Sequence, residues 1–449
     1  MSDSKSNRQQ LACNYIREHY VVPNLIRFDV IAQKVQIRDA TIETAEARET
    51  FSKPKSSAWR YISNADINSM VCDACSETGA SITSKEILTV LNAGTSYIPH
   101  IHPLREFLNN LSDYVPENEP DWIDLVAQQV RVMDTSNRGE GSSGVEEDNT
   151  TQPHSSEVDR LWRICFKKWF VAMVASWLFD GVVNHQVLVL IGRQGIYKTT
   201  WLERLIPPHL RDYCCKLANT TQLGKDDRLR IAEFGLINLD ELDAMTPREL
   251  NAMKSVITAS DVNERVAYGY TKERRVRLAS FCASSNKREF LTDITGNRRW
   301  LPFEVESIQN PFETTILYGR LYAQARYLVQ YGFNYWFDLV DISRIEEHND
   351  AFRAQDSEEQ LLPILFDVPA EGYGEFMTTA QISERLVSYG NIKKPMAVSQ
   401  LGMLLGKSGY KAVTRGSRNA RVRGWIVYQR DSSEIDANRK LFAKECVTV

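Results

Sequence analysis

The segment QVLVLIGRQGIYKTTWLERLIPP, which begins at Gln186, constrains the fold of this chain more than any other. It is a run of aliphatic residues, then a glycine-containing loop, then Lys198, Thr199 and Thr200 at the start of an amphipathic stretch. Strands buried in a parallel sheet are continuous apolar runs of this kind, and the first turn of a following helix directs its backbone N–H groups toward the loop. The sequence therefore predicts a strand, a loop and a helix here.

The loop carries most of a phosphate-binding pattern. A nucleoside triphosphate needs converging backbone N–H donors, a cation and a hydroxyl that can bind Mg²⁺, which the pattern G-x-x-x-x-G-K-[ST] supplies. Tyr197 stands where the second glycine should be, so we expect Gly195 to take over its backbone conformation. The predicted nucleotide-binding residues are Gly192, Gln194, Gly195, Tyr197, Lys198, Thr199 and Thr200. The alternative is an ordinary strand-to-helix turn with an exposed lysine.

Two adjacent carboxylates end a second apolar run, in FGLINLDELD. Phosphoryl transfer needs one carboxylate that holds Mg²⁺ and another that polarises the attacking water. We expect Asp240 to bind Mg²⁺ together with Thr199, and Glu241 to act on the water. The alternative is an acid pair that caps a helix after a core strand, but Lys198 and Thr199 upstream favour the catalytic interpretation.

A third apolar run, LASFCASSN, ends at Asn286, whose amide can orient the water, although asparagine also commonly ends strands. The segment ITGNRRWLPF then presents Arg298 and Arg299. An arginine offered by a neighbouring subunit stabilises charge in the transition state of phosphoryl transfer. The alternative is a structural ion pair with Asp293 or Glu304.

The run from about Trp162 to Glu304 resembles the virulence-associated E family of P-loop ATPases, most closely its Bacteroidetes-type members. The resemblance lies in IGRQGIYKTTWLERLIPP, LINLDELD, NERVAYGYTKERRVRLASFCASSN and LTDITGNRRWLPFEV. The family is related to superfamily 3 helicases and primase-helicases. It implies an AAA+-like α/β core with a parallel sheet, ATP and Mg²⁺ as cofactors, and a homo-oligomeric ring, of which a hexamer is one form. The positions that match its nucleotide motifs are Lys198, Thr199, Asp240, Glu241 and Asn286, with Arg298 or Arg299 as the finger.

The segment between the second and third apolar runs mixes cations with aromatic residues. In ring helicases this region supplies a hairpin that grips single-stranded DNA through phosphate contacts and base stacking. The candidate DNA-binding residues are Arg265, Lys272, Arg274 and Arg275. A solvated, charged hairpin that binds nothing would have a similar sequence.

The C-terminal part is locally basic. From Arg385 to Arg430 there are ten Lys or Arg and no Asp or Glu. Two helical patterns followed by an alternating hairpin predict a winged helix, whose second helix and wing commonly meet DNA. The candidate contacts are Lys407, Lys411, Arg415, Arg418, Arg421 and Arg423. The alternative is a module that docks another protein.

Composition suggests the domain order. Residues 134–159 are rich in Ser, Gly, Thr, Asn and acids, which predicts a flexible linker. We expect an N-terminal accessory module with α+β or helical structure at 1–133, the P-loop ATPase at 160–345, a connector at 346–372, the winged-helix-like domain at 373–432 and a tail at 433–449. Cys72 and Cys75 lack the second ligand pair that a zinc site needs.

Charge and hydropathy bound the function. The 54 Lys and Arg against 58 Asp and Glu argue against a simple polycation, so basic surface must be local. The longest apolar run, Trp169 to Phe179, is too short to span a bilayer, and the start has no secretory pattern, which predicts a cytoplasmic protein without membrane contact. We expect an ATP-dependent motor on single-stranded or forked DNA, in replication or mobilisation of a phage or integrative element. The alternatives are a nucleotide-gated DNA-binding regulator with little turnover and a P-loop small-molecule kinase.

Overall fold

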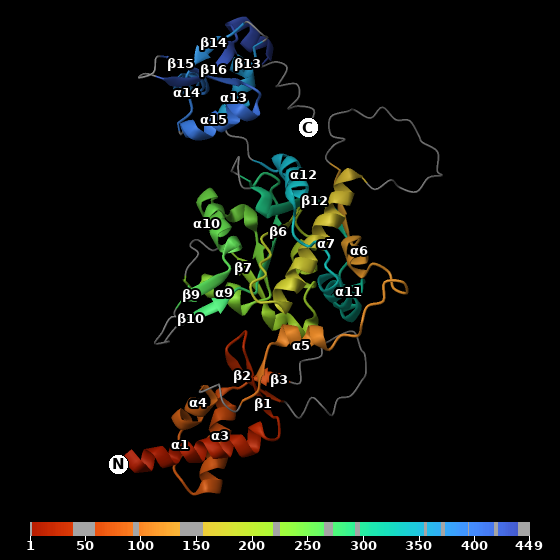
Figure 1. The fold of residues 1–449 in the computed structure, drawn as a ribbon, viewed down its shortest axis with the longest axis vertical. Helices are drawn as coiled ribbons and strands as arrows, with labels where there is room; N and C mark the ends of the chain where they lie inside the picture. The colour runs from red at the N-terminus through yellow and green to blue at the C-terminus, as the bar shows by residue number, and fades with distance from the viewer. Residues whose placement is uncertain are drawn as a thin grey trace. The chain divides into compact units, whose positions relative to one another are not determined.

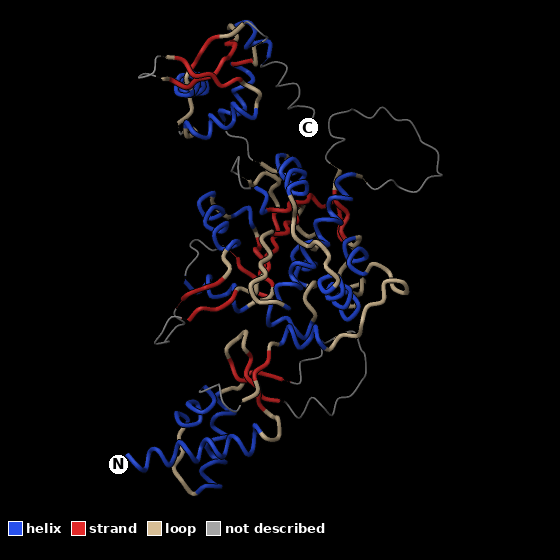
Figure 2. The backbone as a smooth tube through the Cα atoms, in the orientation of Figure 1, coloured by secondary structure: helices blue, strands red, loops and turns tan. Residues whose placement is uncertain are grey.

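The computed structural model describes residues 2–38, 59–92, 98–134, 156–218, 225–264, 273–291, 297–353, 357–369, 373–393, 395–416 and 421–438. Figures 1 and 2 show the elements in these ranges. The chain divides into two compact units. The first unit contains residues 1–133, 155–286 and 299–341, and the second contains 134–154, 287–298 and 342–449.

A six-stranded sheet in the order β5-β12-β6-β11-β8-β7 forms the centre of the first unit. The strands are β5 (Val130–Val132), β6 (Val187–Ile191), β7 (Cys214–Ala218), β8 (Leu236–Asp240), β11 (Ser280–Ser285) and β12 (Trp300–Ile308). Neighbouring strands are parallel except β5, which runs antiparallel to β12. Every residue of β6 and β11 is buried, as expected when both faces of a sheet are covered. This confirms the α/β core with a parallel sheet.

Helices cover this sheet. They are α7 (Glu157–Leu178), α8 (Lys198–Glu203), α9 (Lys225–Glu233), α10 (Pro247–Thr258) and α11 (Tyr318–Gln330). In Figure 1, α7 and α11 lie side by side, and they are in contact. Trp201 of α8 packs against Phe166 of α7, with ring centroids 5.5 Å apart, and its indole N–H donates to the Gln129 side chain at 3.0 Å. These contacts fix the short helix that begins at Lys198.

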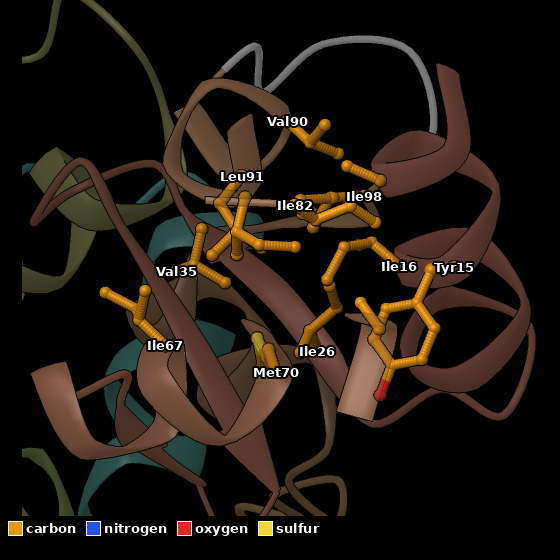
Figure 3. Packing of buried hydrophobic residues seen from close by; sticks show 13 residues of the cluster. Tyr15, Ile16, Ile26, Val35, Ile67, Met70, Ile82, Val90, Leu91 and Ile98 are labelled. Atoms are coloured by element: carbon orange, nitrogen blue, oxygen red, sulfur yellow. The ribbon is translucent and has the colours of Figure 1, made fainter. Parts of the chain in front are cut away.

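The N-terminal part of the first unit has a sheet and core of its own. Strands β1 (Ile26–Asp29), β2 (Lys34–Arg38), β3 (Trp59–Tyr61) and β4 (His100–Ile101) pair in the order β3-β2-β1-β4. The helices are α1 (Ser2–Ile16), α3 (Asn64–Thr78) and α4 (Ser84–Asn92), with a π-helix at Arg17–Val21. Figure 3 shows Ile16, Met70 and Leu91 from these helices, and Ile82 from the connection between α3 and α4, converging on one core.

The carboxylate of Asp29 joins this N-terminal sheet to the central one. It accepts hydrogen bonds from the backbone N–H of Ile31 (2.8 Å) and Ala32 (3.1 Å) and from the hydroxyls of Tyr61 (3.0 Å) and Tyr213 (2.6 Å). Tyr213 ends the 3₁₀-helix that precedes β7. Burial, followed by the charge of Asp29, raises the pKa of both tyrosines, so they remain protonated donors.

The segment just before residue 133 packs on the central sheet. It contains α5 (Pro103–Asn109), α6 (Trp122–Ala127) and β5, and α6 contacts both α7 and α11. The expected accessory module at 1–133 therefore includes β5 of the central sheet and the helices packed next to it. The expected linker at 134–159 lies mostly outside the described residues.

Two strands of the central sheet begin later than the apolar runs that predict them. The runs start at Phe234 and Leu278, and the strands are found at 236–240 and 280–285. The first begins late because α9 continues through Glu233. The second begins late because the chain between β10 (Glu273–Val276) and β11 buries Arg277, which is 2% exposed.

The guanidinium of Arg277 ties several elements together through backbone carbonyls. It donates to Ala279 (2.9 Å) and Asn184 (2.9 Å), and to three carbonyls at the end of α10. Those three are Val256, Ile257 and Ala259. The last carbonyls of a helix lack partners within the helix, and a cation there also interacts favourably with the helix dipole.

The second unit contains α12 (Leu339–Asp350) from residue 342 onward and a small C-terminal module. The module's helices are α13 (Ser357–Leu365), α14 (Thr379–Gly390) and α15 (Val398–Lys407). Its strands are β13 (Phe366–Asp367), β14 (Glu375–Met377), β15 (Lys411–Arg415) and β16 (Val422–Gln429), and the other three all pair with β16. Leu386, Leu401 and Trp425 are among the buried residues of its core. The order of two helices and a hairpin agrees with the pattern expected from the sequence.

We predict that Arg277→Leu lowers the free energy of unfolding by about 3 kcal/mol, because it leaves buried carbonyls without donors. The matched control is Arg274→Leu, whose side chain is 75% exposed and pairs with Asp261. Its effect should stay below about 1 kcal/mol. Urea denaturation followed by tryptophan fluorescence measures both, and equal losses would contradict the role given to Arg277.

Candidate functional site

The loop 192–197 leaves β6 in a conformation that requires glycine at its start. Gly192 has φ of 155°, and a Cβ added there would lie 2.9 Å from the carbonyl oxygen of Val305. Gly195 also has a positive φ, of 88°, and an added Cβ would meet no atom within 4 Å. The backbone at Gly195 is therefore open to a ligand.

Tyr197 keeps the left-handed conformation that the second glycine of the pattern would adopt. It has φ of 67° and ψ of 16° and stands just before α8. Gly195 has the positive φ expected of it, but it does not replace Tyr197, which also has a positive φ. A left-handed conformation costs a non-glycine residue about 1–2 kcal/mol. The ring of Tyr197 lies edge-on to Phe312, with centroids 6.3 Å apart.

Lys198 lies across the loop that it follows. Its Nζ donates to the carbonyls of Gly192 (2.7 Å) and Arg193 (2.7 Å) and to Oδ1 of Asn286 (3.2 Å). Burial lowers the pKa of this lysine, against the opposing charges of Asp243 and Asp240. The ammonium is thus held by oxygen atoms that a phosphate can replace.

The carboxylate of Asp240 joins four elements. Its Oδ1 accepts hydrogen bonds from the hydroxyls of Thr199 (2.8 Å) and Ser284 (2.6 Å), and its Oδ2 pairs with Nζ of Lys216 at 2.6 Å. Burial alone would raise the pKa of Asp240, but the hydrogen bonds from Lys216, Ser284 and Thr199 outweigh burial and lower it. The carboxylate is therefore ionised.

Strand order explains why these residues meet. Strand β11 lies between β6 and β8, and all three are parallel, so their carboxyl ends share one edge of the sheet. Thr199 follows β6, Ser284 is near the end of β11 and Asp240 ends β8. Ligands of open α/β sheets bind at this edge.

Glu241 and Asn286 lie beside this network. Glu241 is exposed, has φ of 55°, and forms no side-chain hydrogen bond or ion pair in the described part of the chain. The backbone N–H of Asn286 donates to Oδ1 of Asp243 at 3.2 Å, while its side chain accepts from Lys198. Asp243 therefore holds Asn286, whose side chain contacts Lys198.

Three residues of the network escaped the sequence analysis: Asp243, Ser284 and Lys216. Asp243 and Ser284 carried a signal, since they stand in the same motifs as Asp240 and Asn286. Lys216 carried none, because only the pairing of β7 with β8 brings it to Asp240.

The donor set fits Mg²⁺. The Thr199 hydroxyl and the Asp240 carboxylate are oxygen ligands, which Mg²⁺ prefers, and Mg²⁺ usually binds through one or two carboxylates together with water and substrate phosphates. Thr199 and Asp240 are the residues that would hold it.

Two further predicted nucleotide-binding residues flank Lys198 in the sequence. Gln194 precedes it and is exposed, and Thr200 follows it and is partly buried.

The two candidate finger arginines fall in different units. Arg298 is exposed and belongs to the second unit, and Arg299 is partly buried and belongs to the first. Within the residues that the structure covers, the side chain of Arg299 has no hydrogen bond or ion pair. It therefore does not form the structural ion pair with Glu304 that was the alternative interpretation. Asp293 lies outside the described residues.

The predicted hairpin before the third motif is present as two antiparallel strands, β9 (Asp261–Glu264) and β10. Arg265 and Lys272 lie outside the described residues. Arg274 is exposed, whereas the side chain of Arg275 is 10% exposed and donates to Glu233 (2.7 Å) and to the carbonyl of Ile31 (2.7 Å). Arg275 is thus held by internal contacts, which corrects its assignment as a DNA ligand.

The basic residues of the C-terminal module gather on its hairpin. Lys411, Arg415, Arg421 and Arg423 are exposed on or next to β15 and β16, and Arg418 lies outside the described residues. The guanidinium of Arg415 stacks over Phe376, 4.9 Å from the ring centroid. On α15 the exposed side chains include Val398 and Met403, and Lys407 at its end is paired with Asp350 at 3.5 Å. The positive charge therefore lies on the β15–β16 hairpin more than on α15.

Comparison with known proteins gives one family match and several distant structural matches. The apo C-terminal region of NrS-1 covers 90% of this chain and 96% of its own length at 11% identity, with a TM-score of 0.35. A second form of that region has a TM-score of 0.38 at 10% identity. A RuvB mutant from Thermotoga maritima covers 57% of this chain and 91% of its own, at 12% identity and a TM-score of 0.23. TM-scores this low do not establish a shared fold.

The search of curated proteins finds no match. No helix in the described ranges has the length and apolar character needed to cross a membrane. The family model of the virulence-associated protein E-like domain matches residues 148–355, which contain the loop, Asp240, Glu241 and Asn286. Residues 148–355 therefore match the family that the sequence motifs resemble.

Proposed function

We propose that this chain is a Mg²⁺- and ATP-dependent motor that acts on DNA as a homo-oligomeric ring, in replication or mobilisation of a phage or integrative element. One observation carries the proposal: Thr199, Ser284 and Asp240 form one hydrogen-bonded set next to Lys198, at the carboxyl ends of parallel strands. Phosphoryl transfer needs this combination of cation, hydroxyl and carboxylate. The family match over the same residues supports it.

In this proposal the loop 192–197 and Lys198 bind the β- and γ-phosphates. Lys198 exchanges the carbonyls of Gly192 and Arg193 for phosphate oxygens, at little cost because both sets are oxygen acceptors. Mg²⁺, held by Thr199 and Asp240, would offset the charge of the phosphates. The carboxylate of Glu241 accepts a proton from the attacking water, and Asn286, fixed by Asp243, orients that water.

Contact with DNA is assigned to the basic hairpin of the C-terminal module, which we propose is a winged-helix-like domain. Its exposed arginines and lysines can neutralise phosphates without reading sequence. Arg274 remains a second candidate contact. The arginine that reaches a neighbouring subunit's nucleotide is assigned to Arg298 or Arg299.

A second candidate function is a nucleotide-gated DNA-binding regulator with little turnover. The observation that favours it is the state of the loop, where Lys198 is hydrogen-bonded to loop carbonyls and Tyr197 holds a strained conformation. Such a loop can bind nucleotide and rearrange without completing hydrolysis. This function predicts tight ATP binding by the wild type with negligible phosphate release.

Lys198→Ala should lower Mg²⁺-dependent ATP hydrolysis by about a hundredfold or more, because removing one preorganised donor to a developing charge costs that much. The matched control is Lys85→Ala, an exposed lysine of α4, which should leave the rate unchanged. Phosphate release in the presence of single-stranded DNA measures both. Equal rates for the wild type and Lys198→Ala would refute the assignment of the loop.

Glu241→Gln should keep ATP affinity within about twofold while hydrolysis falls by about a hundredfold, because the amide preserves shape and cannot accept the proton. Fluorescent-nucleotide binding and phosphate release, measured on the same preparation, separate the two effects. Unchanged hydrolysis would remove Glu241 from the mechanism. Tight binding without turnover by the wild type itself would select the regulator instead.

Replacing Arg421 and Arg423 together with Ala should weaken binding to duplex and forked DNA and reduce the salt slope of affinity by about two, one for each lost phosphate contact. Lys407→Ala, whose ammonium already pairs with Asp350, should change the slope less. Fluorescence anisotropy over a series of salt concentrations gives both slopes. An unchanged slope in the double variant would exclude the hairpin as the DNA contact.

A further inference from the structure

Lys216 is a cation at the candidate metal site that the proposed mechanism does not use. It lies on β7, the edge strand of the central sheet, where its register partner on β8 is Asn238. Its Nζ is 2.6 Å from Oδ2 of Asp240, and its side chain is 48% exposed against 16% for Asp240. The lysine therefore reaches into the site from the solvent side.

The contacts of Thr199, Ser284 and Lys216 together engage both carboxylate oxygens of Asp240. Thr199 and Ser284 donate to Oδ1, at 2.8 and 2.6 Å, and Lys216 pairs with Oδ2. The charge of the carboxylate is thus balanced before any metal arrives. A divalent cation held by Thr199 and Asp240 would lie close to this ammonium, and like charges at such a distance repel strongly in a partly buried site.

We propose that Lys216 is a positioning residue that holds Asp240 in the nucleotide-free chain and competes with Mg²⁺ for its Oδ2. Thr199 and Asp240 would then take up metal only together with the nucleotide, whose phosphates would supply the negative charge toward which the displaced ammonium turns. This inference rests on the proposed function of the site. It makes metal binding and nucleotide binding depend on each other through one side chain.

The chemistry of lysine suits this role. Its ammonium is a compact charge on a flexible stem with freely rotating donors, so it can leave one carboxylate oxygen and turn to another acceptor. Its half-exposed position on an edge strand leaves room for that movement. The hydroxyls of Thr199 and Ser284 keep Asp240 in place when the ammonium leaves.

The test is Mn²⁺ binding to the full chain without nucleotide, measured by electron paramagnetic resonance of the free ion. Lys216→Met should bind Mn²⁺ about tenfold more tightly than the wild type, in the usual range of coupling between sites. Lys216→Arg, which keeps the charge, should behave like the wild type. The matched control is Lys167→Met, which removes an ion pair of the same 2.6 Å length, to Asp121, away from the site.

The same titration with ATP present gives a second readout. In the wild type, nucleotide should increase Mn²⁺ affinity strongly, whereas in Lys216→Met the increase should be about tenfold smaller, since the competing charge is already absent. If Lys216 served folding alone, its replacement would not change the ratio of the Mn²⁺ affinities measured with and without ATP. Thermal denaturation confirms that each variant is folded before titration.

The outcomes separate the two claims. If the wild type binds ATP with metal and Lys216→Met gains no Mn²⁺ affinity, the inference is overturned and the proposed function stands. The inference also fails if Lys167→Met gains as much as Lys216→Met. If the wild type binds no nucleotide with either metal, the proposed function fails and the inference fails with it.

Discussion

The carboxylate of Asp240 is the interaction on which the rest of the site depends. It is the point where β8, β11, β7 and the start of α8 meet, through Ser284, Lys216 and Thr199. A partly buried charge must find partners or lose its ionisation, so these contacts constrain all four elements at once. The parallel order of the strands makes this possible, because it places their carboxyl ends on one edge.

The same principle holds the larger structure together. Asp29 joins the N-terminal sheet to the central one through two tyrosine hydroxyls, and Arg277 joins α10 to the start of β11 through backbone carbonyls. In each case one buried ionic group satisfies several partners from different segments. Apolar packing, such as that of Trp201 against Phe166, then fixes α8 and with it the residues that begin that helix.

Local patterns were enough to find the strands, the loop and the two carboxylates, because each of these features consists of residues that are consecutive in the sequence. Asp240 ends β8, although that strand begins later than its apolar run suggests. Lys216 could not be found in this way, since its contact depends on which strand pairs with β8. Arg275 was misassigned for the same reason, because the carbonyl of Ile31 and the carboxylate that hold it come from distant segments. Tyr197 shows the limit of motif reasoning, because a residue that breaks the pattern still adopts the conformation that the pattern needs.

In the proposed function, the edge of the sheet formed by the carboxyl ends of its parallel strands hydrolyses ATP with Mg²⁺ and couples that reaction to DNA. The most direct measurement is phosphate release from ATP by the full wild-type chain, with Mg²⁺ or with a chelator, and with or without forked DNA. We expect phosphate release that requires Mg²⁺ and rises when DNA is added. Release no faster than in buffer under every condition would refute the proposed function.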